Sequence, residues 1–295
     1  MTMGFRIISI RSRVKLEHRL NYLVIRGETE KKIHISEINT LILQSTAVSL
    51  TASLLAVLVE NNVKVIFCDK KCNPVSELMP YYGTHNSSGR LAEQINWDKS
   101  VKDDVWQEIV QRKIISQAEH LSDLGFSGES DMLLRYVDDV EPGDITNREG
   151  HAAKVYFNCI FGQTNSRRTE SFENACLNYG YAVILSAFNR EIAACGYLTQ
   201  LGIWHHNEYN DFNLACDLME PLRVTVDRKM MMLKEGECDF KREMAEVLNA
   251  RALSGGKNTT LDIAIRNYVR SVICRLNGED RELLFPEGIT FVDGS

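Results

Sequence analysis

The sequence predicts an α+β protein, with an N-terminal β-rich domain over residues 1–80 and a larger all-α domain over residues 91–295. Three observations lead to this fold class. Short segments rich in Ile, Val and Leu fill the first eighty residues. Tyr81–Gly89 is rich in Gly, Ser and Asn and has no apolar period, which predicts a linker over residues 81–90. After it, apolar residues recur at helical spacing.

The N-terminal domain is expected to be built mainly from short strands. Several segments alternate polar with apolar residues, as half-buried strands do. A helix is expected over Ser49–Asn61, begun by Ser49 or Thr51, and Pro74 and Pro80 should break regular structure afterwards. The predicted strands are Arg6–Ile10, Lys15–Leu20, Tyr22–Arg26, Lys31–Ile35, Thr40–Gln44 and Val63–Phe67.

The second domain is expected to be almost entirely helical. The strongest pattern lies in Ser171–Gln200, and Gly196 and Gly202 suggest that this helix ends before the next histidines. The predicted helices are Asp98–Asp123, Asp131–Val137, Asn147–Phe161, Ser171–Gln200, Phe212–Lys234, Lys241–Leu253 and Thr260–Leu276.

Composition is that of an ordinary soluble protein, with 44% hydrophobic and 25% charged residues. No apolar run is long enough to span a bilayer and no secretory signal opens the chain, so a cytoplasmic protein without a membrane partner is expected. The eight cysteines are scattered, as reduced cysteines are. The net charge of −6 does not suggest a nucleic-acid binder, although local basic clusters can contact phosphates.

The stretch His205–Arg223 carries the strongest chemical signal. Glu220 follows His205 by fifteen residues, and Asp217 precedes Glu220 by one helical turn in an otherwise apolar segment. Two carboxylates on one helix face repel unless a cation lies between them, and a metal ion would also use a neutral imidazole. The alternative is that both acids cap the helix or pair with arginines such as Arg223. Pro221, which bends a helix, favours a functional site.

A third acid, Glu149, opens a helix and has two interpretations. Thr146-Asn147-Arg148-Glu149 fits a capping box, in which the glutamate binds the cap backbone. Glu149 could instead join Glu220 and His205 in a site whose oxygen ligands and single imidazole favour Mg²⁺ or Mn²⁺. Asn178, on the long helix, could support a ligand or satisfy backbone groups.

Four segments occur in an order that resembles a known family. They are Glu149-Gly150-His151-Ala152-Ala153, Asn178-Tyr179-Gly180-Tyr181-Ala182, Gly202-Ile203-Trp204-His205 and the segment from Leu214 to Arg223. Together they resemble the CRISPR-associated spacer-acquisition integrase, the metal-dependent subunit that inserts new spacers into the CRISPR array. The N-terminal run FRIISIRSRVKLEHRLNYLVIR is similar to the type II branch, which accompanies a single large effector nuclease.

The resemblance implies roles for individual residues. The metal-binding and catalytic set matches Glu149, His205 and Glu220. The spacing to Glu220 favours His205 over the adjacent His206. Asp217, Asn178 and Arg223 would support this site, Asp217 more by positioning than by direct ligation. The implied reaction is transesterification, in which the 3′-hydroxyl of a short duplex attacks a repeat border.

The resemblance also implies partners. Family members form homodimers through the N-terminal domain, and two dimers flank a dimer of a small second acquisition protein with double-stranded DNA across the assembly. In the type II branch a ring-shaped DNA-binding protein and the effector nuclease also take part. Two other functions stay open at this stage: a helical metal-dependent phosphohydrolase acting on small nucleotides, and a non-catalytic DNA-binding scaffold.

Overall fold

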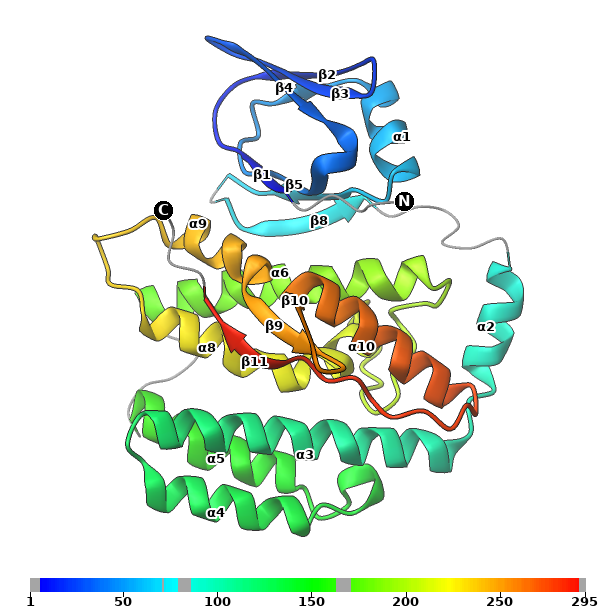
Figure 1. Cartoon of the computed structure of the whole chain (residues 1–295), viewed down its shortest axis with the longest axis vertical. Coiled ribbons are helices and arrows are strands. Elements are labelled where there is room, and N and C mark those ends of the chain that lie inside the picture. The colour runs from blue at the N-terminus through cyan, green and yellow to red at the C-terminus, as the bar shows by residue number, and fades with distance from the viewer. Residues whose placement is uncertain (1–5, 71, 79–85, 163–170, 292–295) are drawn as a thin grey trace. The chain divides into compact units, whose positions relative to one another are not determined.

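A computed structural model describes residues 6–70, 72–78, 86–162 and 171–291. The chain forms two compact units, Met1–Tyr82 and Gly83–Ser295. The first is rich in strands and the second is mainly helical, which confirms the α+β class (Figure 1). Among the described helices, none combines the length and apolar character needed to cross a membrane.

The N-terminal unit contains two four-stranded sheets. The first has the order β1 (Arg6–Ile10), β5 (Ile38–Leu43), β7 (Lys64–Cys68) and β8 (Pro74–Leu78), and only β8 is antiparallel to its neighbour. The second has the order β4 (Glu30–His34), β3 (Tyr22–Arg26), β2 (Lys15–Arg19) and β6 (Ser49–Leu50). The helix α1 (Ala52–Glu60) packs on β2 and β7.

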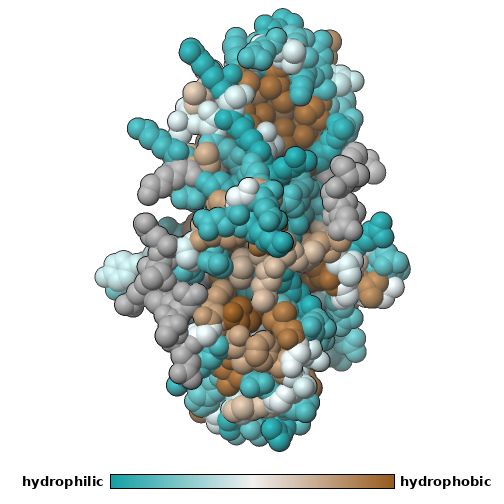
Figure 2. All heavy atoms as spheres, turned by 90° about the vertical axis from the view of Figure 1, so that its left-hand side faces the viewer, coloured by the Kyte–Doolittle hydropathy of each residue, from teal (hydrophilic) through white to brown (hydrophobic). Residues whose placement is uncertain are grey.

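The core of this unit comes from the apolar phase of those strands, with Leu16, Leu41 and Leu54 fully buried. Helix α1 begins after Thr51, whose hydroxyl accepts a hydrogen bond from the Leu54 amide at 3.2 Å. Pro74 does not interrupt the sheet as expected, because it is the first residue of the edge strand β8, a place where a missing amide donor is tolerated. On the face shown in Figure 2, hydrophobic atoms gather in a patch over the N-terminal unit.

The C-terminal unit is a set of helices around the long α3 and α6. In Figure 1, α3, α4 and α5 lie side by side, and the three pack on one another. Its helices and helical turns are α2 (Ser87–Ile95), α3 (Lys99–Asp123), α4 (Ser127–Asp138), η2 (Pro142–Asp144), α5 (Arg148–Phe161), α6 (Phe172–Ala194), α7 (Asn213–Met219), η3 (Glu220–Leu222), α8 (Arg223–Met231), α9 (Phe240–Ala245), η4 (Glu246–Asn249) and α10 (Leu261–Leu276).

Three details of the helical unit differ from expectation. A small sheet of order β10 (Lys257–Thr260), β9 (Arg251–Ser254) and β11 (Glu287–Thr290) is added to the helices. The helix expected over Lys241–Leu253 is therefore too long, since its last residues pair in β9 before a turn at Gly255 and Gly256, both at positive φ. In the expected linker, residues 81–85 lie outside the described residues, and α2 begins at Ser87.

A buried polar network ties four helices of this unit together: α3, α5, α6 and α8. Tyr156 donates its hydroxyl proton to Asp227 at 2.9 Å, and Tyr181 donates to the same carboxylate at 2.5 Å. The Tyr156 oxygen lies 2.7 Å from Nδ1 of His120. Because the single hydroxyl proton is used on Asp227, Nδ1 of His120 must be the donor in this contact. Burial lowers the pKa of His120 to about 4.

The chain is expected to lose stability as pH falls from 6.5 to 4. In this window the unfolded chain protonates His120 and the folded chain does not, so the free energy of unfolding falls, by no more than about 1.4 kcal/mol per pH unit for one proton. His120→Gln should flatten this slope in urea unfolding measured at several pH values. His151→Gln, at an exposed position of α5, is the matched control. An unchanged slope in His120→Gln would show that other groups control the acid response.

Candidate active site

The centre of the candidate site is a lysine that the sequence did not single out. Lys113 lies on the buried face of α3, 6% exposed, at helical spacing from Trp106, Ile109 and Val110. Its Nζ contacts Oε1 of Glu149 and lies 2.5 Å from Oε2 of Glu220. A lysine in the apolar phase of a helix was the signal for this contact, because a buried ammonium needs carboxylate partners.

Glu149 faces this lysine because another residue caps its helix. The carboxylate of Asp144 accepts hydrogen bonds from the Arg148 amide at 2.8 Å and from the Glu149 amide at 3.0 Å. Asn147 precedes α5 in a left-handed conformation, with φ of 53°, and makes no side-chain cap. The capping-box interpretation of Thr146–Glu149 is therefore wrong. With Asp144 satisfying the first amides, the Glu149 side chain is available to the site.

Glu220 is placed by the break between two short helices. Pro221 follows it in η3, which separates α7 from α8. Nε of Arg223 donates to Oε1 of Glu220 at 2.7 Å, while Lys113 binds the other oxygen. Burial alone would raise the pKa of Glu220, but the charges of Lys113 and Arg223 outweigh it and lower this pKa to about 2. The expected pairing with Arg223 is thus present, together with a second cation.

Asp217 holds the histidine loop. This fully buried carboxylate accepts hydrogen bonds from three successive backbone amides, those of Ile203 at 2.8 Å, Trp204 at 3.0 Å and His205 at 3.2 Å. It also lies 2.5 Å from Nδ1 of His205. The hydrogen bond to Asp217 is the main cause that raises the pKa of His205. These contacts give Asp217 the geometry of a positioning residue.

Two further features restrict the conformation of the loop that carries His205. A Cβ on Gly202 would lie 2.3 Å from the His205 carbonyl oxygen and 2.8 Å from Asp217, so only glycine fits there. The Trp106 ring stacks on Trp204 at 5.6 Å between centroids and meets the His205 ring edge-on at 5.7 Å. His205 is therefore held by Asp217 on one ring nitrogen and flanked by an indole. Both His205 and the neighbouring His206 are exposed.

The other predicted supports differ in their positions. Arg223 lies over the Tyr181 ring, 5.0 Å from its centroid, and so links Glu220 to the network of Asp227. Asn178 is exposed on α6, and its supporting role stays a prediction.

Glu149, His205 and Glu220 offer the donor atoms that a divalent cation prefers, but their side chains do not surround a common point. In the described ranges, no three His, Cys, Asp or Glu side chains are close enough together to hold a metal ion as they stand. Glu149 and Glu220 nevertheless already share one cation, the ammonium of Lys113. Two carboxylates and one imidazole are the donors that Mg²⁺ or Mn²⁺ accepts. The donor types of these residues therefore fit a divalent metal.

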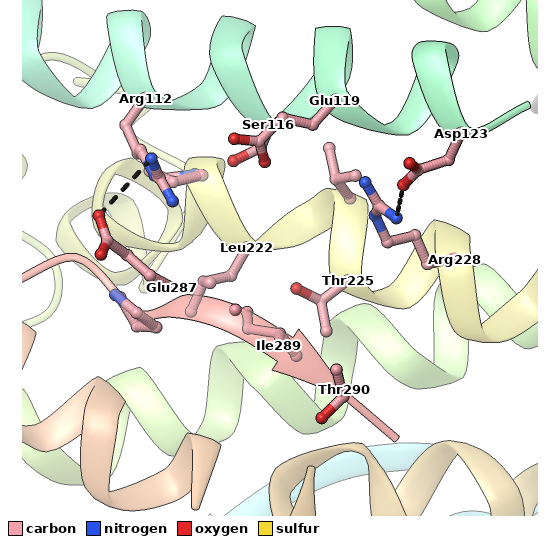
Figure 3. A pocket seen from close by; sticks show the side chains of 14 residues that line it. Arg112, Ser116, Glu119, Asp123, Leu222, Thr225, Arg228, Glu287, Ile289 and Thr290 are labelled. Atoms are coloured by element: carbon pink, nitrogen blue, oxygen red, sulfur yellow. Dashed lines mark hydrogen bonds and ion pairs between the residues drawn. The ribbon is translucent and has the colours of Figure 1, made fainter. Parts of the chain in front are cut away.

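A pocket of about 340 Å³ adjoins this cluster but does not include its residues. Figure 3 shows α3, the segment after Glu220 and β11 around it. Its two arginines already have carboxylate partners: Arg112 lies 3.8 Å from Glu287, and Arg228 pairs with Asp123. With both arginines neutralised, this pocket does not have the character of a phosphate site.

Comparison with known proteins identifies the family. The profile of the family described as "CRISPR associated protein Cas1" matches residues 7–253. The chain belongs to the Cas1 family. A "CRISPR-associated endonuclease Cas1" from Neisseria meningitidis is 33% identical over 234 residues, 79% of this chain and 77% of the relative. A Cas1 endonuclease from Pyrobaculum aerophilum is 26% identical over 240 residues, 75% of this chain and 79% of the relative. The resemblance inferred from the sequence segments is confirmed.

Solved structures show the same fold. A Cas1 protein from Thermotoga maritima has a TM-score of 0.74 at 18% identity, covering 94% of this chain and 98% of the other. A casposase bound to its integration product has a TM-score of 0.75 at 19% identity, covering 99% and 96%. The arrangement of an N-terminal β-rich unit before a helical unit is thus that of Cas1 proteins.

Proposed function

We propose that this Cas1-family protein is a divalent-metal-dependent DNA integrase and endonuclease of CRISPR adaptation, which joins short duplex DNA to the borders of a repeat. Family membership and the likeness to endonucleases named Cas1 support the nuclease class. The observation that carries the catalytic assignment is the convergence of Glu149 and Glu220 on a single cation beside the oriented His205.

Glu149, His205 and Glu220 would hold Mg²⁺ or Mn²⁺. When bound, the metal would polarise the target phosphate and stabilise charge on the attacking and leaving oxygens. The chain's own residues do the positioning. Asp217 occupies Nδ1 of His205, so Nε2 is the ring nitrogen left for a ligand role. Arg223 fixes the Glu220 carboxylate from its other oxygen.

The nucleophile is assigned to DNA. Tyr181 is linked to the cluster through Arg223, but its hydroxyl is engaged with Asp227, which makes it a support. The 3′-hydroxyl oxygen of the incoming duplex forms a bond to the target phosphorus, and the bond from phosphorus to the target strand's own 3′ oxygen breaks. One proton passes from the attacking to the leaving oxygen. No covalent enzyme intermediate is required.

The proposed partners are double-stranded DNA, a second copy of the chain and the small second acquisition protein. A solved "Cas6-RT-Cas1--Cas2 complex" contains a chain with a TM-score of 0.71 to this one, at 16% identity and covering 98% of this chain and 37% of that one. The hydrophobic patch on the N-terminal unit supports self-association through that unit, because large exposed patches mark interaction surfaces (Figure 2). The ring-shaped DNA-binding protein and the effector nuclease belong to the same proposal.

The test is a joining assay with a short duplex, a repeat-bearing plasmid, the small partner and Mn²⁺ or Mg²⁺. We expect joined products at the repeat border, and none with dideoxy 3′ ends or excess chelator. Dideoxy ends should leave DNA binding intact, because binding rests on phosphate contacts that weaken with salt. Joining of dideoxy-ended duplexes, or joining in chelator, would refute the proposal. Hydrolysis of mononucleotides would favour the phosphohydrolase, and DNA binding without metal uptake would favour the scaffold.

A further inference from the structure

Lys113 fills the position where the two glutamates of the site converge. Its ammonium is buried and is the shared partner of Glu149, from α5, and Glu220, from η3. Burying an ammonium is unfavourable unless carboxylates surround it, so Glu149 and Glu220 stabilise Lys113 in this position. The same contact keeps two carboxylates near each other that would otherwise repel.

Both carboxylate oxygens of Glu220 already bind a cationic side chain while this contact persists. Lys113 binds Oε2 and Arg223 binds Oε1. Of these two cations, Lys113 is the one that also binds Glu149, and thus the one whose place a shared metal ion must take. A compact ammonium on a flexible stem can leave such a place more readily than the planar guanidinium of Arg223.

We propose that Lys113 is a built-in counter-cation that holds the site closed without metal, and that a divalent ion enters by displacing its ammonium from Glu149 and Glu220. This inference rests on the proposed function, since it takes these residues as metal ligands. The protein then alternates between a lysine-closed and a metal-loaded site. The apparent metal affinity is the intrinsic affinity multiplied by the fraction of metal-free molecules in which Lys113 leaves the carboxylates unoccupied.

Displacement also raises the local charge. With His205 neutral, the three carboxylates of Glu149, Asp217 and Glu220 and the two cations Lys113 and Arg223 sum to −1 in the lysine-closed site. A divalent ion in place of the ammonium brings this sum to 0. Metal loading therefore removes the net negative charge that repels phosphate, which orders metal before the target phosphate.

The experiment compares Mn²⁺ binding by wild type and Lys113→Met, followed by the electron paramagnetic resonance signal of free Mn²⁺, together with the metal-free melting temperature. Methionine keeps the length of the side chain and removes its charge. We expect Mn²⁺ to bind Lys113→Met more tightly, on the order of tenfold or more, because no ammonium competes. The metal-free melting temperature should fall, and Mn²⁺ should restore more of it than in wild type.

The matched control is Lys64→Met. Lys64 is also a buried lysine near a glutamate, Glu77 at 3.7 Å, but it lies in the N-terminal unit. This variant should lose stability without any change in Mn²⁺ affinity. Unchanged or weaker Mn²⁺ binding by Lys113→Met overturns the inference. Failure of the proposed function looks different: wild type itself would bind no Mn²⁺, or Glu149→Gln would bind it as well as wild type.

Discussion

Glu220→Gln is expected to abolish strand joining, with a loss of more than about 100-fold, while duplex binding stays within a few-fold of wild type. Substitution of a residue that hydrogen-bonds a metal ligand commonly lowers activity by about 10–100-fold, so removal of a ligand itself should lower it more. Glutamine keeps the shape of the side chain, but its neutral amide cannot replace the charged carboxylate. That carboxylate binds Lys113 in this structure and would bind the metal in the proposed loaded site. Joining is measured in the plasmid assay and binding by fluorescence anisotropy.

A second buried glutamate, Glu191, provides a control that separates the loss of buried ion pairs from the loss of a metal ligand. Glu191 is 3% exposed and pairs with Arg190 at 2.8 Å and Arg266 at 3.3 Å, much as Glu220 pairs with Lys113 and Arg223. Glu191→Gln should therefore lower the melting temperature by a similar amount and still join DNA. If both variants lose joining in proportion to their lost stability, Glu220 has a structural role and the catalytic assignment fails.

His205→Ala should likewise remove joining by more than about 100-fold, whereas His206→Ala should change it by only a few-fold. Both histidines are exposed, but the ring of His205 is oriented by Asp217 and lies against Trp106. The loop should keep its conformation in His205→Ala, because Asp217 still accepts three backbone amides. Circular dichroism and melting temperature check the fold, and Mn²⁺ titration checks the ligand role.

The pair of histidine variants separates ligation from packing. His205→Ala should bind Mn²⁺ weakly and His206→Ala as wild type does. Equal losses of joining in both, accompanied by equal losses of melting temperature, would assign the pair a packing role. Asp217→Asn offers an intermediate case, with an expected loss of about 10–100-fold, because it removes a group that orients a ligand.

Much of the fold follows from periodicity in the chain. Several strands of the N-terminal unit lie where polar and apolar residues alternate, and the helices α3, α5 and α10 lie close to their predicted bounds. Helix α6 begins as predicted but ends at Ala194 rather than at Gln200. The strands β9, β10 and β11 were missed because each has four residues, too few to show a period. The sequence does not predict strand β8, because a proline such as Pro74 is expected to break regular structure.

The candidate site was only partly predictable. Glu149, His205 and Glu220 follow from the family resemblance, and so does the supporting role of Asp217. Lys113 was not predicted, since its partners lie far away in the sequence and only tertiary packing brings them together. Asp144 was not predicted either, because it caps α5 from a turn with positive φ rather than from the usual cap position.

The residues of the candidate site lie far apart in the sequence, and this separation determines at which stage of folding the site is assembled. Lys113 meets Glu149 across 36 residues and Glu220 across 107 residues, from three separate helical elements. Contacts between residues so far apart in the sequence form only when the helical unit folds. The chain must first lose the entropy of closing long loops, and the contacts stabilise the fold only afterwards. A chain still emerging from the ribosome, or one partly unfolded by heat, has its acids apart. For the proposed integrase activity, this confines the breaking and joining of DNA strands to the fully folded molecule.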